Sequence, residues 1–104
     1  MNDFTKVATN SEIPEGGKLY VELDERLVVI FRAGGDLYCL DDVCTHDGGP
    51  LGEGQLSGYE IACPRHGAKF DMRTGQALTM PATEATAVHE IKSEGDDVLV
   101  RLSQ

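Results

Sequence analysis

The sequence contains no tryptophan, only three cysteines, and half as many basic residues as acidic ones. Three is an odd number for a disulfide framework, and cysteine close to histidine in a reducing compartment more often binds a metal. No segment approaches the roughly 18 apolar residues of a membrane-spanning helix. The N-terminal segment has no basic region followed by an apolar run, so no secretory signal is expected. These absences predict a cytoplasmic protein that does not enter a membrane.

The charge of the chain is strongly one-sided. Nine Lys and Arg residues face eighteen Asp and Glu residues, which gives a formal net charge of −9. Such a field repels phosphate backbones, so nucleic acid is not expected as a partner. Two interpretations of the charge stay open, because it can attract a basic protein surface or simply keep a small protein dissolved.

Two catalytic patterns are also missing. No G-x-G-x-x-G dinucleotide fingerprint follows a strand pattern. No 2-His-1-carboxylate iron site of the kind that reacts with oxygen is recognisable. The chain is therefore expected to be no enzyme by itself.

Short apolar segments separated by turn residues run along the chain, without long helical periodicity. This pattern is typical of an all-β protein built as a sandwich or small barrel. The length predicts one domain, residues 1–104. The segments expected to be strands are 18–23, 26–33, 37–42, 59–62, 68–71, 86–93 and 97–103. Two Gly/Pro-rich segments, 44–58 and 63–67, are expected to be loops without strand.

Each of these two loops carries one cysteine and one histidine. Cys44 and His46 have one residue between them, and Cys63 and His66 follow sixteen residues later with two residues between them. Structural zinc sites usually pair two cysteines and then two histidines, whereas each pair here is mixed. Thiolate and imidazole in equal number suit a two-iron cluster, and zinc on the same four ligands stays an alternative. A plant-type ferredoxin set starting at Cys39 fails, because a fourth cysteine does not exist.

The segments C-T-H (44–46) and C-P-R-H-G (63–67) resemble the Rieske [2Fe–2S] signature. The likeness extends to "EIPEG", "GPLGEG", "FDMRTG" and "MPAT", which are similar to segments of small bacterial Rieske-type ferredoxins. The resemblance implies a Rieske fold of small antiparallel sheets with a cluster-binding loop subdomain, at about residues 43–54 and 62–70. It also implies that Cys44 and Cys63 hold one iron of the cluster, and that His46 and His66 hold the other.

The resemblance implies an electron carrier. Such a ferredoxin takes one electron from a flavin-dependent NAD(P)H reductase and passes it to a terminal oxygenase. A small Rieske subunit of a larger redox enzyme, such as an assimilatory nitrite reductase, is the alternative function. A monomer is expected, because no strand offers a long apolar edge.

The residues Ala68 and Phe70 bear on the reduction potential. High-potential Rieske proteins have serine and tyrosine hydroxyls at these places, and hydrogen bonds to cluster sulfur stabilise the reduced state. Without the two hydroxyls, we expect a potential of roughly −150 to −50 mV, at the low end of the Rieske range.

Other residues near the ligand loops have simpler expected roles. Cys39 lies on an alternating segment and is expected to be a small buried hydrophobe. His89 is expected at the surface or at a sheet edge, and not as a ligand. Gly48 and Gly49 are expected to face the cluster. The acidic residues near the first loop are expected to be a solvated face, with a docking rim as the alternative; they are Asp41, Asp42, Asp47 and Glu53.

Overall fold

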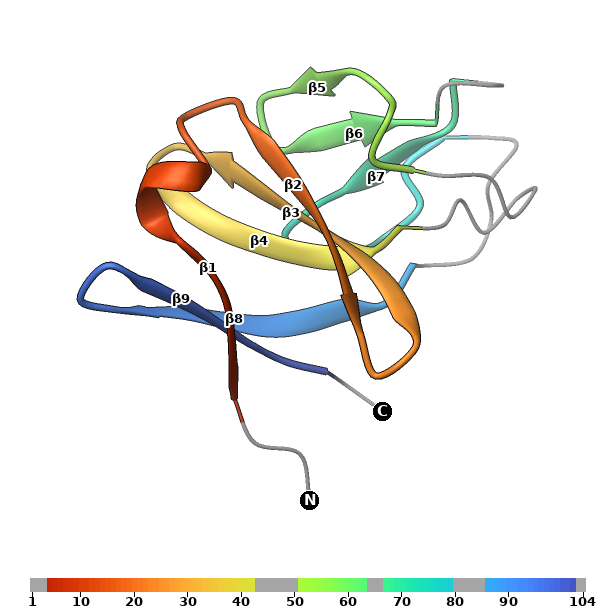
Figure 1. Cartoon of the computed structure of the whole chain (residues 1–104). Coiled ribbons are helices and arrows are strands. Elements are labelled where there is room, and N and C mark those ends of the chain that lie inside the picture. Colours follow the sequence, from red (N-terminus) through yellow and green to blue (C-terminus); the bar gives the residue numbers. More distant parts are fainter. Residues whose placement is uncertain (1–3, 43–50, 64–66, 80–85, 103–104) are drawn as a thin grey trace.

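The computed structural model describes residues 4–42, 51–63, 67–79 and 86–102, and almost all of its regular structure is β-strand (Figure 1). The elements are β1 (Thr5–Thr9), the 3₁₀ turn η1 (Asn10–Glu12), β2 (Lys18–Leu23), β3 (Arg26–Ala33), β4 (Asp36–Asp41), β5 (Leu56–Ser57), β6 (Glu60–Ala62), β7 (Lys69–Asp71), β8 (Val88–Glu94) and β9 (Asp97–Arg101). Six strands form one sheet in the order β1-β9-β8-β4-β3-β2, and β5, β6 and β7 form a smaller one. All pairs are antiparallel, so the expected all-β architecture is confirmed. No helix in the described part of the chain has the length and apolarity needed to span a membrane.

The β2–β3 hairpin forms where two apolar segments flank Asp24 and Glu25. Both turn residues have positive φ, 51° and 66°, as a two-residue hairpin turn of type I′ requires. The ladder starts with Lys18 opposite Phe31 and continues to the turn without a register shift. The prediction of strands at 18–23 and 26–33 is confirmed at both ends of both strands.

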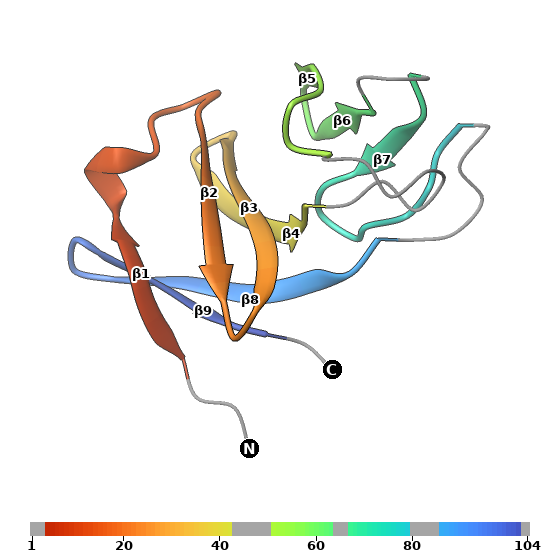
Figure 2. The same cartoon turned by 45° about the vertical axis from the view of Figure 1, so that its right-hand side comes forward.

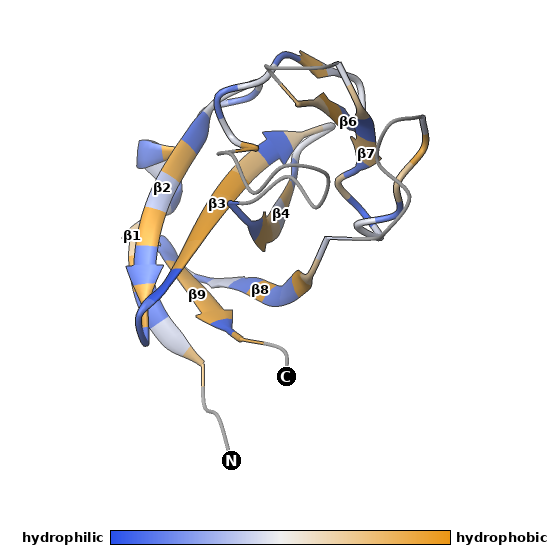
Figure 3. Ribbon diagram, turned by 90° about the vertical axis from the view of Figure 1, so that its right-hand side faces the viewer, coloured by the Kyte–Doolittle hydropathy of each residue, from blue (hydrophilic) through white to orange (hydrophobic). Residues whose placement is uncertain are grey.

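Strand β3 belongs to two hydrophobic cores. Val29 and Phe31 pack in one core with Phe70 and other side chains of the small sheet. The alternate residues Val28 and Ile30 pack in a second core with apolar side chains of β9. A strand that is buried on both faces has a continuous apolar run, which Figure 3 shows along most of β3. The strand therefore joins the small sheet to the large one.

The small sheet lies on one side of strands β2, β3 and β4, and β1, β8 and β9 lie on the other (Figure 2). Tyr59, just before β6, makes an edge-to-face contact with Tyr38 of β4, with ring centroids 5.9 Å apart. The Tyr59 hydroxyl also lies over Gly34 in the β3–β4 turn, where a Cβ atom would have no room. These contacts fix the small sheet, which carries the second ligand loop, on the large one.

Two strands were not expected from the sequence. Strand β5 lies within 44–58, so the prediction that this segment contains no strand is wrong for residues 56–57. Strand β1 pairs with β9, although Ala8 is its only buried residue. Neither segment carries the period-two apolar alternation by which strands are detected. The other predicted strands agree with the structure to within two residues at each end.

Candidate metal centre

Only one of the four predicted ligands, Cys63, lies within the described residues. Cys44, His46 and His66 lie outside them, as do Gly48 and Gly49. Cys63 follows β6 directly, is 2% exposed, and forms no disulfide. Within the described ranges, no three Cys, His, Asp or Glu side chains come together as a metal site. The ligand set therefore stays a prediction, and the structure describes the elements that flank it.

The second ligand loop closes at its base by backbone hydrogen bonds. The Cys63 amide donates to the Ala68 carbonyl oxygen at 2.6 Å, and the Gly67 amide donates to the Cys63 carbonyl oxygen at 2.9 Å. Gly67 has a φ of 73°, which glycine adopts without strain. The two bonds continue the β6–β7 hairpin beyond its last ladder pair, so Cys63 stands at the base of the second ligand loop.

The first ligand loop is also closed at its base. Strand β4 ends at Asp41, and the amide of the next residue, Asp42, donates to the Leu27 carbonyl oxygen at 2.9 Å. The Asp42 carboxylate accepts a hydrogen bond from the Gly52 amide at 2.7 Å. The two ends of the segment 43–51 therefore lie side by side.

The bases of the two loops approach each other. Gly54 lies so close to the Ala62 carbonyl oxygen that a Cβ atom would overlap it, and the Ala62 amide donates to the Gln55 carbonyl oxygen at 3.0 Å. A cavity of about 340 Å³ opens here, and it is lined by Glu53, Gly54, Gln55, Ala62, Cys63 and Gly67. Cys63, buried and without a disulfide, is thus one of the residues that line a cavity between the flanks of the two predicted ligand loops, which fits a cluster held between them.

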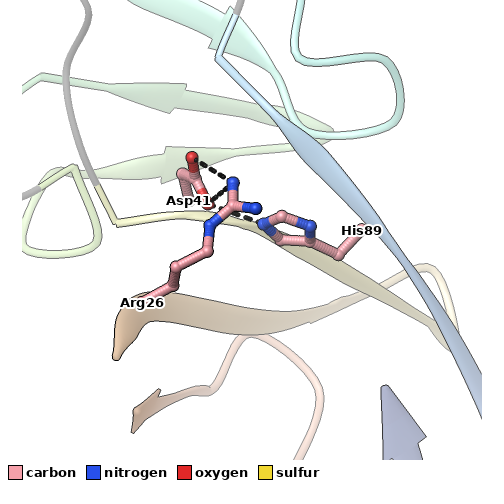
Figure 4. A network of polar contacts seen from close by, with 3 residues as sticks. All are labelled: Arg26, Asp41 and His89. Atoms are coloured by element: carbon pink, nitrogen blue, oxygen red, sulfur yellow. Dashed lines mark hydrogen bonds and ion pairs between the residues drawn. The ribbon is translucent and has the colours of Figure 1, made fainter. Parts of the chain in front are cut away.

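His89 does not lie at the surface, and that prediction is wrong. Its strand β8 pairs with both β4 and β9, and its side chain is fully buried. The His89 Nε2 atom lies 2.6 Å from the Asp41 Oδ1 atom, and Arg26 Nη2 donates to both Asp41 carboxylate oxygens at 3.0 Å (Figure 4). Because His89 and Asp41 are 48 residues apart, no local pattern in the sequence could reveal the pair.

The acidic residues beside the first loop are not a common solvated face. Asp41 binds Arg26 and His89, and Asp42 binds the Gly52 amide, so the expectation of a solvated face is wrong for both. Glu53 is exposed, as expected, and Asp47 lies outside the described residues. The Asp41 and Asp42 carboxylates therefore make structural hydrogen bonds at the base of the first loop.

Cys39 is a buried hydrophobe, as predicted. It is 1% exposed and packs in the core that contains Val28 and Ile30. Burial, and then the nearby Asp41 carboxylate, raise the pKa of the Cys39 thiol to about 12. The thiol therefore stays protonated at neutral pH, whereas a metal ligand must be a thiolate.

Beyond the second loop, Ala68 and Phe70 are fully buried and bring no hydroxyl group to this region. Asp71, at the end of β7, accepts hydrogen bonds from the Arg73 guanidinium at 3.1 and 3.0 Å. These bonds hold the pKa of the Asp71 carboxyl below its ordinary value. The same guanidinium stacks on Tyr59, 4.7 Å from the ring centroid, so it also ties the strand to the contact between the sheets.

Comparison with known proteins places these features in a family. Residues 3–93 match the family model of the Rieske [2Fe-2S] domain. The chain is 38% identical, over 92 residues and 88% of each chain, to the ferredoxin component of the naphthalene 1,2-dioxygenase system of Pseudomonas aeruginosa. It is 39% identical, over 97% of its length and 94% of the relative, to the biphenyl dioxygenase ferredoxin subunit of Pseudomonas sp. (strain KKS102).

Solved structures share the fold over almost the whole chain. The ferredoxin of carbazole 1,9a-dioxygenase from Nocardioides aromaticivorans IC177 superposes with a TM-score of 0.91 and 26% identity, over 96% of this chain and 98% of that one. A chain from the complex of reduced oxygenase and oxidized ferredoxin in carbazole 1,9a-dioxygenase gives a TM-score of 0.89 and 31% identity, over 94% of this chain and 92% of that one.

Proposed function

The chain belongs to the Rieske [2Fe–2S] domain family, and on this premise we propose that Cys44, His46, Cys63 and His66 are the four ligands of its cluster. The protein is an electron carrier that holds one Rieske-type cluster, and not a catalytic enzyme. Bound there, the cluster supplies a one-electron store with a potential of about −150 to +300 mV. Cys44 and Cys63 would bind one iron as thiolates, and His46 and His66 would bind the other through one ring nitrogen each.

The observation that carries this assignment is the closeness of the two loop bases. Gly54 lies two residues after Gly52, at the base of the first loop. It packs against Ala62, the residue directly before Cys63. Cys63, which is buried and forms no disulfide, is one of the residues that line the cavity between them. Two thiolates and two imidazoles, with Cys39 protonated in the core, match the Rieske donor set in number and kind.

The proposed partners follow from the relatives. The curated relatives are named ferredoxin components of dioxygenase systems, and one solved structure is a complex of a ferredoxin with its oxygenase. We infer that this chain takes one electron from a flavin-dependent NAD(P)H reductase and passes it to a terminal oxygenase. We further infer a cytoplasmic monomer in which residues 1–104 form a single domain with cluster-binding loops at about 43–54 and 62–70.

Ligand substitution tests the assignment. Cys44→Ser and His66→Ala are each expected to abolish the visible spectrum of the cluster, because each removes one iron ligand. Cys39→Ser is the matched control, because it changes a thiol that lies in the core and is not one of the predicted ligands. Bleaching by Cys39→Ser, or a normal spectrum in Cys44→Ser, would show that the ligands are assigned wrongly.

The role as a separate carrier needs its own test. The purified protein is expected to support oxygenase turnover when it is mixed with a separate reductase and a separate oxygenase. Purification at a fixed stoichiometry with one larger enzyme, and no activity as a free chain, would contradict the carrier role.

A further inference from the structure

The residue Gly52, which follows the segment 43–51 of the first ligand loop, is held by side chains from two directions. Its amide donates to the Asp42 carboxylate at 2.7 Å, and its carbonyl oxygen accepts a hydrogen bond from Lys18 Nζ. Asp42 follows β4, and Lys18 begins β2. The Asp42 amide is itself bound to the Leu27 carbonyl oxygen of β3 at 2.9 Å. Both polar backbone groups of Gly52 are therefore tied to the large sheet.

The same glycine is pressed against the surface of the sheet. A Cβ atom on Gly52 would lie 2.6 Å from Tyr20 Cε1 and 2.9 Å from Val29 Cγ2, so a side chain does not fit without displacing them. The preceding residue, Leu51, is fully buried in the core that contains Val29. The chain thus leaves the first ligand loop along a defined path on β2 and β3.

The chain then turns directly to the second ligand loop. The Gly54 amide donates to the Leu51 carbonyl oxygen at 3.1 Å, which closes residues 51–54 into a turn. Gly54 packs on the Ala62 carbonyl, and the Ala62 amide donates to the Gln55 carbonyl oxygen. Ala62 precedes Cys63. One turn therefore contacts the large sheet at its start and the base of the second ligand loop at its end.

We propose that Leu51–Gly54 acts as a strut that sets the spacing of the two ligand loops, and that Asp42 is the positioning residue that anchors it. Asp42 touches no predicted ligand in the described structure and acts through the Gly52 amide. Holding the two ends of the segment 43–51 together reduces the loss of conformational entropy that accompanies cluster binding. Support from outside the ligand shell of this kind orients metal ligands and strengthens binding. The inference rests on the proposed function, because it takes the two loops to share one cluster.

The test compares Asp42→Ala with Asp42→Asn in the cluster-loaded full-length protein. Asn keeps an oxygen acceptor for the Gly52 amide, whereas Ala removes it. Glu22→Ala is the charge control, because it removes an exposed carboxylate from the same sheet. Hydrogen exchange by mass spectrometry is followed in peptides covering residues 51–56 and, for the core, residues 97–101. Release of iron to a chelator gives the lifetime of the cluster.

Asp42→Ala is expected to speed both the exchange of the 51–56 peptide and the release of iron by roughly 10- to 100-fold, the loss expected for one hydrogen bond to a charged group. Asp42→Asn and Glu22→Ala are expected to stay within about threefold of the parent protein, and the 97–101 peptide is expected not to change. Unchanged exchange at 51–56 in Asp42→Ala would overturn the proposal. Equal acceleration at 97–101, or equal effects of Ala and Asn, would overturn it as well, by pointing to global destabilisation or to lost charge.

Failure of the proposed function would look different. If the parent protein cannot be loaded with a [2Fe–2S] cluster, the ligand assignment fails. The exchange of the 51–56 peptide in the unloaded chain would still report on the Asp42–Gly52 bond, so the two failures can be told apart.

Discussion

Replacing His89 by leucine is expected to destabilise the protein more than removing the guanidinium of Arg26, although Arg26 makes more hydrogen bonds to the same carboxylate. His89 makes one contact to Asp41, at 2.6 Å, from a fully buried ring. Arg26 makes two hydrogen bonds at 3.0 Å, from a side chain that is 38% exposed. A hydrogen bond to a charged group contributes about 1.5–3 kcal/mol, whereas an exposed ion pair contributes about 0–1 kcal/mol. The buried His89 contact is therefore expected to contribute more to the free energy of unfolding than the more exposed Arg26 bonds.

The two variants His89→Leu and Arg26→Met both keep an apolar side chain in place, so cavity formation adds little to either. For a domain of this size, 1 kcal/mol corresponds to a shift in Tm of about 4–8 °C. His89→Leu is therefore expected to lower Tm by about 10 °C, and Arg26→Met by about 3 °C, when both are measured by circular dichroism at one scan rate. A double-mutant cycle with Asp41→Asn isolates each pair.

Two results would refute this reasoning. One is an equal or larger Tm loss in Arg26→Met, which would mean that the number of hydrogen bonds outweighs burial. The other is a coupling between positions 89 and 41 below about 0.5 kcal/mol, the level at which independent sites already appear additive.

Three further predictions follow from the core, the strut and the cluster environment. Because burial raises the pKa of Cys39 from 9.0 to about 12, its contribution to stability is present below pH 9 and is lost as the pH rises toward 12. Urea unfolding should therefore show the parent losing about 2 kcal/mol relative to Cys39→Ala between pH 7.5 and pH 10.5, and a constant difference would contradict the buried thiol. Gly54→Ala should lower the free energy of unfolding by about 3 kcal/mol, because the added Cβ atom overlaps the Ala62 carbonyl. The control Gly58→Ala should cost about 1 kcal/mol, because only its positive φ is strained. Equal shifts in Tm for the two variants would argue against the close contact between Gly54 and Ala62. A redox titration should give a midpoint of roughly −150 to −50 mV, since Ala68 and Phe70 bring no hydroxyl group; a midpoint well above about +100 mV would be inconsistent with this environment.

Local sequence patterns were sufficient to predict most strands. The hairpin of β2 and β3 was predictable because its two apolar segments and the two turn residues between them lie within sixteen consecutive positions. The C-terminal hairpin of β8 and β9 has the same kind of signal around Gly95. Strands β1 and β5 carried no such signal, because one is mostly exposed and the other has only two residues. Alternation detects a strand only where it is long enough and buries one face.

The candidate site also has features that were predictable from local sequence and features that were not. The kinds and spacing of Cys44, His46, Cys63 and His66 were sufficient to predict a cluster and a family, because ligand chemistry depends on residue type and on short loops. The bonds that support the loops were not predictable. Asp41 reaches His89 across 48 residues, and Asp42 reaches the Gly52 amide across a ligand loop.

The all-β class and the main hairpins were predictable from the residues alone, and the donor set is a prediction of the same kind, because each of these depends on residues close together in the chain. The burial of His89, the hydrogen bonds of the half-buried Asp41 and Asp42, and the glycine turn that contacts the bases of both ligand loops became visible only in the folded chain. Hydrogen bonds and close packing between distant segments depend on where the backbone places them, and no local pattern records that placement.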